Sequence, residues 1–156
     1  MTDIGAVEAA LSYAARGWEV FPLLPGMKIP KKDFRWAARA SKSEADIVRM
    51  FSGHMNIGIA TGMRSRLLVC DVDLYKDDGA ESFKHLIEER GMDWTFTSCV
   101  ATPRGGLHYY FELDEPSSSQ NDFLPGIDIK ADGGYVVAPP STISGQGAYT
   151  WKEEWS

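Results

Sequence analysis

Apolar residues recur every three or four positions in three parts of the chain, a spacing that places their side chains on one face of a helix. Gly17 stands just beyond the first part, and Ser41 and Glu44 open the second with a capping-box pattern. The predicted helices span residues 4–16, 41–53 and 80–90 of the 156-residue sequence.

Shorter runs of β-branched and aromatic residues predict strands. They cover residues 18–24, 56–62, 67–74, 95–102, 107–113 and 134–138, and Tyr149 with Trp151 indicates a last strand. Residues 28–40 show no clear period, and residues 114–122 form a polar segment. Because the chain has no internal repeat and no long linker, we expect one domain over residues 1–156, of the α+β class with a mainly antiparallel sheet.

The predicted strand over residues 67–74 carries two carboxylates, Asp71 and Asp73. Side chains alternate between the faces of a strand, so these two would share a face about 6–7 Å apart. Two anions at that separation raise each other's pKa unless a cation relieves them, and Mg²⁺ does so with oxygen ligands and substrate phosphates. Asp-x-Asp also occurs in turn caps and on solvated strands, so this pattern leaves both interpretations open.

A second candidate is His108, in the predicted strand over residues 107–113. Its apolar neighbours Leu107 and Tyr109 would face the core, so His108 would point away from the core, where it needs a partner or a catalytic task. The preceding glycine-containing turn carries Arg104, a cation suited to a triphosphate or a template. A structural role for the histidine remains the alternative.

The third candidate pair is Asp128 and Lys130, which alternate with Ile127 and Ile129 and would therefore share a face. An acid that binds metal beside a lysine that binds phosphate is what nucleotidyl transfer needs. An ion pair along one strand face explains the same spacing.

Charge and composition limit the function classes. The 44% hydrophobic and 12% aromatic content is that of a folded protein, and the net charge of −6 argues against a broad surface for nucleic acid. Residues 1–50 are the exception, with eight Lys/Arg against six Asp/Glu. Template contacts are therefore expected in the basic loop of this part, where the candidates are Lys28, Lys31, Lys32 and Arg35. A solvent-exposed loop without a ligand would explain this cluster of cations almost as well.

Cys70 and Cys99 lie in apolar runs with no Cys/His spacing around them, so we expect reduced core thiols and no zinc site. No apolar run reaches the length of a membrane span, and no signal segment precedes the first helix. We therefore expect a cytoplasmic protein with no membrane partner.

Three short motifs in order carry a family resemblance: Asp71-Val72-Asp73, Gly106-Leu107-His108 and Ile127-Asp128. They resemble the motifs of the archaeo-eukaryotic primase superfamily, in particular the bifunctional DNA primase/polymerase (prim-pol) N-terminal domain of phage and plasmid replication proteins. Phrases over residues 9–23, 28–30, 56–62 and 133–141 extend the resemblance over nearly the whole chain.

The resemblance implies roles for these residues. Asp71, Asp73 and Asp128 would hold two Mg²⁺ or Mn²⁺ ions, and His108 would contact the phosphates of the incoming nucleotide together with Lys130 and Arg104. The implied fold is a small N-terminal α/β unit packed on an RRM-like sheet, with the active site in the cleft between them. The zinc stem of some relatives is missing here, which puts a primer-initiation role in doubt.

The implied activity is template-directed transfer of a nucleotide to a 3′-hydroxyl, with release of pyrophosphate. Two alternatives stay open: a metal-dependent phosphodiesterase or nuclease, and a catalytically idle DNA-binding module of a replication protein. The implied partners are a DNA template and primer, dNTP or NTP substrates, and a helical or helicase region later in the same polypeptide. A phage- or plasmid-encoded protein in a prokaryotic host is expected.

Overall fold

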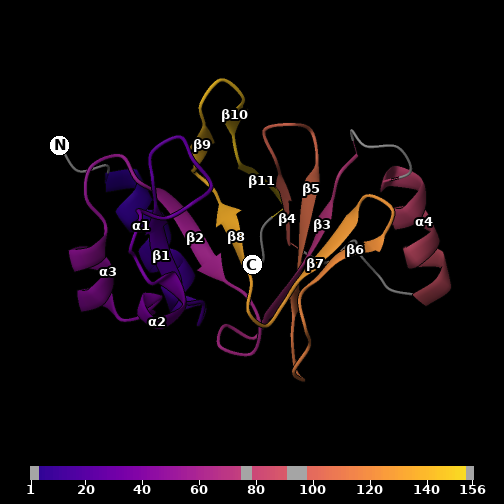
Figure 1. Ribbon diagram of the computed structural model, residues 1–156, viewed down its shortest axis with the longest axis horizontal. Coiled ribbons are helices and arrows are strands. Elements are labelled where there is room, and N and C mark those ends of the chain that lie inside the picture. The colour runs from indigo at the N-terminus through magenta and orange to yellow at the C-terminus, as the bar shows by residue number, and fades with distance from the viewer. Residues whose placement is uncertain (1–3, 75–78, 91–97, 154–156) are drawn as a thin grey trace.

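Two antiparallel sheets form the centre of the computed structural model, which describes residues 4–74, 79–90 and 98–153 (Figure 1). The smaller has the order β1-β2-β8, made by β1 (Val20–Leu23), β2 (Asn56–Ala60) and β8 (Tyr135–Ala138). The larger has the order β11-β4-β5-β3-β7-β6, made by β3 (Leu67–Val72), β4 (Ser98–Ala101), β5 (Leu107–Glu112), β6 (Gln120–Leu124), β7 (Ile127–Lys130) and β11 (Thr150–Glu153). β9 (Thr142–Ile143) and β10 (Gly147–Ala148) form a hairpin.

Helices cover the outer sides of both sheets. α1 (Ile4–Ala15), α2 (Trp36–Arg39) and α3 (Glu44–Met50) surround the smaller sheet, whereas α4 (Gly79–Arg90) lies against the larger one (Figure 1). None of the helices that the structure describes is both long and apolar enough to cross a membrane. Helices combined with antiparallel sheets confirm the α+β class.

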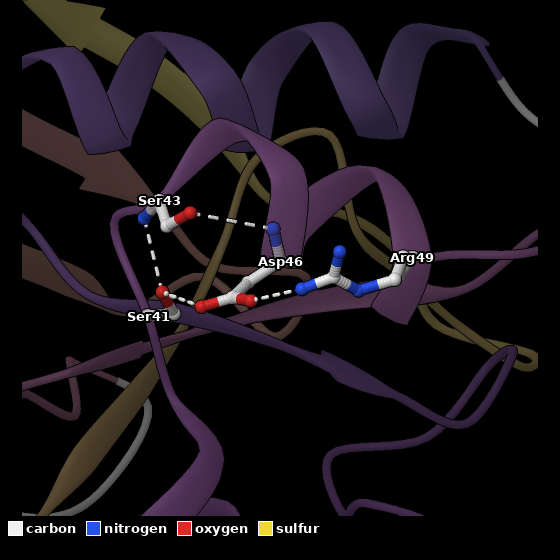
Figure 2. Close-up of polar contacts among 4 residues, drawn as sticks. All are labelled: Ser41, Ser43, Asp46 and Arg49. Carbon is white, nitrogen blue, oxygen red and sulfur yellow. Dashed lines mark hydrogen bonds and ion pairs between the residues drawn. The ribbon is translucent and has the colours of Figure 1, made fainter.

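The start of α3 differs from the predicted capping box. Ser43, and not Ser41, is the N-cap, because its Oγ accepts the backbone N–H of Asp46 at 3.4 Å. The backbone of Ser41 pairs with Val20 instead, and its Oγ donates to the Asp46 carboxylate at 2.8 Å (Figure 2). Asp46 also accepts a hydrogen bond from Arg49 at 2.6 Å, so one carboxylate ties the helix start to its last turn.

Several short elements had no signal in the sequence. β6 begins inside the expected polar segment 114–122; it is an edge strand with mostly exposed side chains, so it needs no apolar alternation. α2 is a single turn within the period-free residues 28–40, too short to show a helical repeat. The first residues of the predicted strand 95–102 lie outside the described part of the chain.

The larger sheet is buried on both faces, which corrects the predicted orientation of His108. One core joins the two sheets and includes Val69 and Tyr110; a second, smaller core lies between the larger sheet and α4 and includes Cys70. His108 is on the Tyr110 side and only 6% exposed, whereas Tyr109 on the other side is half-buried. The prediction assumed that a strand in this sheet has one buried face.

Both cysteines are buried and free, as expected. Burial, together with the nearby carboxylates of Asp71 and Asp128, raises the pKa of the Cys70 thiol to about 12. The thiol therefore stays protonated and packs as a small apolar group.

Candidate active site

The three sequence motifs meet in one row across the larger sheet. Asp71 on β3 pairs with His108 on β5 in one direction and with Asp128 on β7 in the other. Directly opposed residues of an antiparallel pair share a face, with Cα atoms about 4.5–5.5 Å apart. Asp71 thus becomes the direct neighbour of two residues that lie 37 and 57 positions further along the sequence, His108 and Asp128.

Asp71 is the centre of this row. Its Oδ1 lies 3.4 Å from Nε2 of His108, and the two side chains are 23% and 8% exposed. Burial, the largest influence, acts to raise the pKa of Asp71, but the hydrogen bond and charge of His108, with the charges of Lys130 and Lys28, outweigh it and lower that pKa. Asp71 is therefore ionised at neutral pH although it is mostly buried.

Asp73 follows the end of β3, where glycines permit the chains to approach closely. Its N–H donates to the carbonyl of Gly126 at 2.8 Å. A Cβ on Gly126 would lie 2.6 Å from Cα of Gly79, and one on Gly106 would lie 2.8 Å from the carbonyl oxygen of Val72. Side chains at these glycines would push the neighbouring chains away from the strand end that carries Asp73.

Asp128 is partly engaged by the protein itself. Its Oδ1 accepts the backbone N–H of Asp122 at 2.8 Å, so β6 fixes the carboxylate. No ion pair joins Asp128 to Lys130 in the part of the chain that the structure describes, so the ion-pair explanation of their spacing finds no support.

A cavity of about 460 Å³ lies beside the row, and its lining comes from both sheets and their loops. It falls within the roughly 300–1,000 Å³ typical of small-molecule sites. Five of the predicted site residues line it together with Lys28 from the basic loop: Asp71, Asp73, Arg104, His108 and Lys130. Acids and cations therefore meet in one cavity, an arrangement suited to phosphates accompanied by a metal.

The remaining predicted residues lie elsewhere. Asp128 is in the row but does not line the cavity, and Lys31 borders a separate groove with Phe34 and Arg39. Lys32 and Arg35 are exposed and line neither. The basic loop thus contributes one cation, Lys28, to the cavity.

A model of the bifunctional DNA primase/polymerase N-terminal family matches residues 10–155. The chain belongs to this family. No curated protein sequence matches the chain. Membership supports a general role in DNA priming or polymerisation, with DNA and nucleotides as substrates.

Metal binding by this primase/polymerase domain can be judged from its donor atoms. Carboxylate oxygens are the ligands that hard divalent cations prefer, and Asp71 and Asp128 are direct neighbours. Among the residues that the structure describes, no three His, Cys, Asp or Glu side chains are grouped as a complete metal site. The residues fit an ion such as Mg²⁺ that takes one or two carboxylates and completes its shell with substrate phosphates and water.

The primase/polymerase cavity also has lining residues for which no role was predicted from the sequence. Tyr135 belongs to the family-like phrase 133–141, but nothing in that phrase suggested a contact. Tyr149 lies 5.9 Å from His108 between ring centroids, and Trp36 comes from the period-free residues 28–40. No signal in the sequence distinguishes Trp36, because residues 1–52 hold 6 of the 18 aromatic residues, which is no more than their share of the length.

Proposed function

We propose that this domain extends a primer on a DNA template by metal-dependent nucleotidyl transfer, in which the 3′-hydroxyl attacks the α-phosphate and pyrophosphate leaves. The proposal is carried by one observation: His108, Asp71 and Asp128 form a row beside a cavity that is also lined by lysine and arginine side chains. Acids alone would repel a triphosphate, and cations alone would bind it without activating a hydroxyl.

The carboxylates have distinct tasks in this proposal. Ionised Asp71 would be the central metal ligand, with Asp128 beside it and Asp73 at the end of β3 as the others. Two bound Mg²⁺ or Mn²⁺ ions would activate the attacking hydroxyl and stabilise the leaving pyrophosphate. The Asp122 N–H occupies Oδ1 of Asp128, so the second oxygen of this carboxylate would be the one that binds metal.

The cations would bind and orient the triphosphate. Lys130 and Arg104 line the cavity from β7 and from the β4–β5 turn, and Lys28 approaches from the other sheet. The Nδ1 atom of His108 is buried with no hydrogen-bond partner among the described residues, whereas Nε2 lies 3.4 Å from Asp71. A phosphate oxygen would accept the Nε2 hydrogen bond in place of Asp71, whose carboxylate would then bind the metal. His108 would thus link the metal side of the site to the phosphate side.

A primer-extension gel tests the proposal. The domain is incubated with a labelled primer on a template, with Mg²⁺ or Mn²⁺, and with either dNTPs or NTPs. We expect stepwise longer products, lost in Asp71→Asn and retained in Asp114→Asn, which changes an exposed carboxylate that pairs with Arg66 at 2.8 Å, outside the cavity.

Other outcomes would favour the rival functions. Metal-dependent shortening of the primer without nucleotides, abolished by Asp71→Asn, would indicate a nuclease. Template binding with neither extension nor cleavage under any metal or nucleotide would indicate an idle DNA-binding module.

A further inference from the structure

One part of the cavity lining is aromatic. Trp36 from α2 and Tyr135 from β8 line the same cavity as Asp71 and His108, and their rings pack edge-on, with centroids 5.0 Å apart and an interplanar angle of 66°. Wholly buried Phe21 packs 5.1 Å from each of them, stacked on Trp36 and edge-on to Tyr135. Trp36 and Tyr135 are thus the half-buried members of a group of three packed rings.

Contacts to the smaller sheet hold this group in place. A Cβ on Gly58 would lie 2.6 Å from Cζ of Phe21, so the missing side chain lets the Phe21 ring lie against β2. The Tyr135 hydroxyl donates to the carbonyl oxygen of Lys28 at 2.8 Å, which fixes the ring and the loop that carries Lys28. Rings held this way lose little conformational entropy when a ligand packs on them.

The cavity therefore combines two kinds of lining. Acids and cations come mainly from the larger sheet, whereas the aromatic pair Trp36 and Tyr135 comes from α2 and the smaller sheet. A ligand that matches both has a chain of phosphates at one end and a flat π-system at the other. We propose that Trp36 and Tyr135 form an aromatic platform in which the Trp36 ring stacks on the nucleobase of the incoming nucleoside triphosphate and Tyr135 packs edge-on against Trp36, an inference that rests on the function proposed above.

Stacking suits an enzyme that must accept every base that its template specifies. All four bases have a π-face, so an aromatic platform binds them without selecting among them. It also leaves the hydrogen-bonding edge of the base open for the template. The platform is a positioning element: it holds the base while the groups around Asp71 meet the phosphates.

Calorimetric titration with Mg²⁺ present, in the absence of DNA, tests the platform. The two ligands are dATP and the matching deoxyribose triphosphate that lacks a base. Trp36→Leu should weaken dATP binding by about 5- to 150-fold, the range for loss of one base–aromatic stack. Binding of the base-free triphosphate should stay unchanged, and Trp36→Phe should restore most of the dATP affinity.

Phe34→Leu is the matched control. Phe34 is a half-buried aromatic residue two positions from Trp36, and it borders a different groove, so its replacement should leave the affinity for dATP unchanged. Equal thermal midpoints of the two leucine variants would show that Trp36→Leu does not act through unfolding.

Three results would overturn the platform. Wild-type protein that binds dATP and the base-free triphosphate equally would refute it and leave the proposed activity intact. If Trp36→Leu weakened the binding of dATP and of the base-free triphosphate by the same factor, Trp36 would have a purely structural role. Weakened binding of a single-stranded oligonucleotide with unchanged dATP affinity would assign the ring to the template. If the wild-type protein bound neither triphosphate, the proposed function itself would fail.

Discussion

Two tyrosines in the main core should respond in opposite ways to the same substitution. Tyr110 is fully buried, with rings of Trp18 and Trp151 at 5.4 and 5.1 Å, and its hydroxyl has no hydrogen-bond partner among the described residues. Burial, with Tyr13 and Tyr149 nearby, raises the pKa of Tyr110 well above its usual value, so the hydroxyl stays neutral. Tyr13, in contrast, donates to the carbonyl of Pro139 at 2.6 Å and accepts from the indole of Trp151 at 3.0 Å.

The expected magnitudes follow from these contacts. A buried polar group without a partner costs about 1–3 kcal/mol, so Tyr110→Phe, which keeps the ring and removes the hydroxyl, should raise the free energy of unfolding by about 1 kcal/mol. For a chain of this size that is a rise in Tm of roughly 2–4 °C. Tyr13→Phe removes one partner from two hydrogen-bonding groups and should lower the free energy of unfolding by about 1–3 kcal/mol.

Urea unfolding followed by tryptophan fluorescence measures both variants, and an unchanged m-value would show that the unfolded states are comparable. If Tyr110→Phe were destabilised as much as Tyr13→Phe, the Tyr110 hydroxyl would have a partner in solution, and the assignment of an unsatisfied group would be wrong.

Three further predictions concern the site. Neighbouring groups lower the pKa of Asp71 in the folded state, so its charge stabilises the fold above the unfolded pKa of about 4. The difference in unfolding free energy between wild type and Asp71→Asn, measured by urea titration, should therefore shrink as the pH falls below that value. A difference that stays constant with pH would contradict this. His108→Ala should raise the KM for nucleotide roughly tenfold or more in steady-state extension assays and change template affinity little; the reverse pattern would refute the phosphate role. We expect the domain to extend existing primers but to start few new ones. The first bond of a new primer joins two free nucleotides, and the cavity brings together one set of phosphate-binding side chains. Abundant labelled dinucleotides on an unprimed template would contradict this.

The sequence was enough to place the candidate residues on strands and faces. Alternation put Asp71 on the side of β3 that carries Val69, and the structure shows that this side faces the main core. The pairing of β3 with both β5 and β7 could not be predicted, because it joins strands through contacts that are distant in sequence. The family motifs supplied what local pattern could not, namely that these residues belong together.

The errors have equally specific causes. His108 was placed on the outer face because one apolar face of β5 suggested that the other was solvated, whereas the smaller sheet covers it. Trp36 gave no signal because its environment is built from Phe21 and Tyr135, which lie on strands far from it in the sequence. Single-turn helices and polar edge strands such as β6 carry too few residues to show a period.

Metal removal should weaken nucleotide binding, because the side chains proposed to bind the triphosphate are the same ones that stabilise the negative charge of Asp71. His108, Lys130 and Lys28 together lower the pKa of that carboxyl. A triphosphate that draws these cations toward itself leaves Asp71 less compensated and adds negative charge beside it, so a divalent ion must supply the balance. Nucleotide and metal should then bind with positive coupling, and each should tighten the binding of the other by the same factor.

Calorimetric titration of dATP in EDTA and in Mg²⁺ measures this factor, with Asp71→Asn as the comparison. The difference between the two conditions should be large in the wild type and smaller in the variant, whereas equal affinity with and without metal in the wild type would refute the coupling.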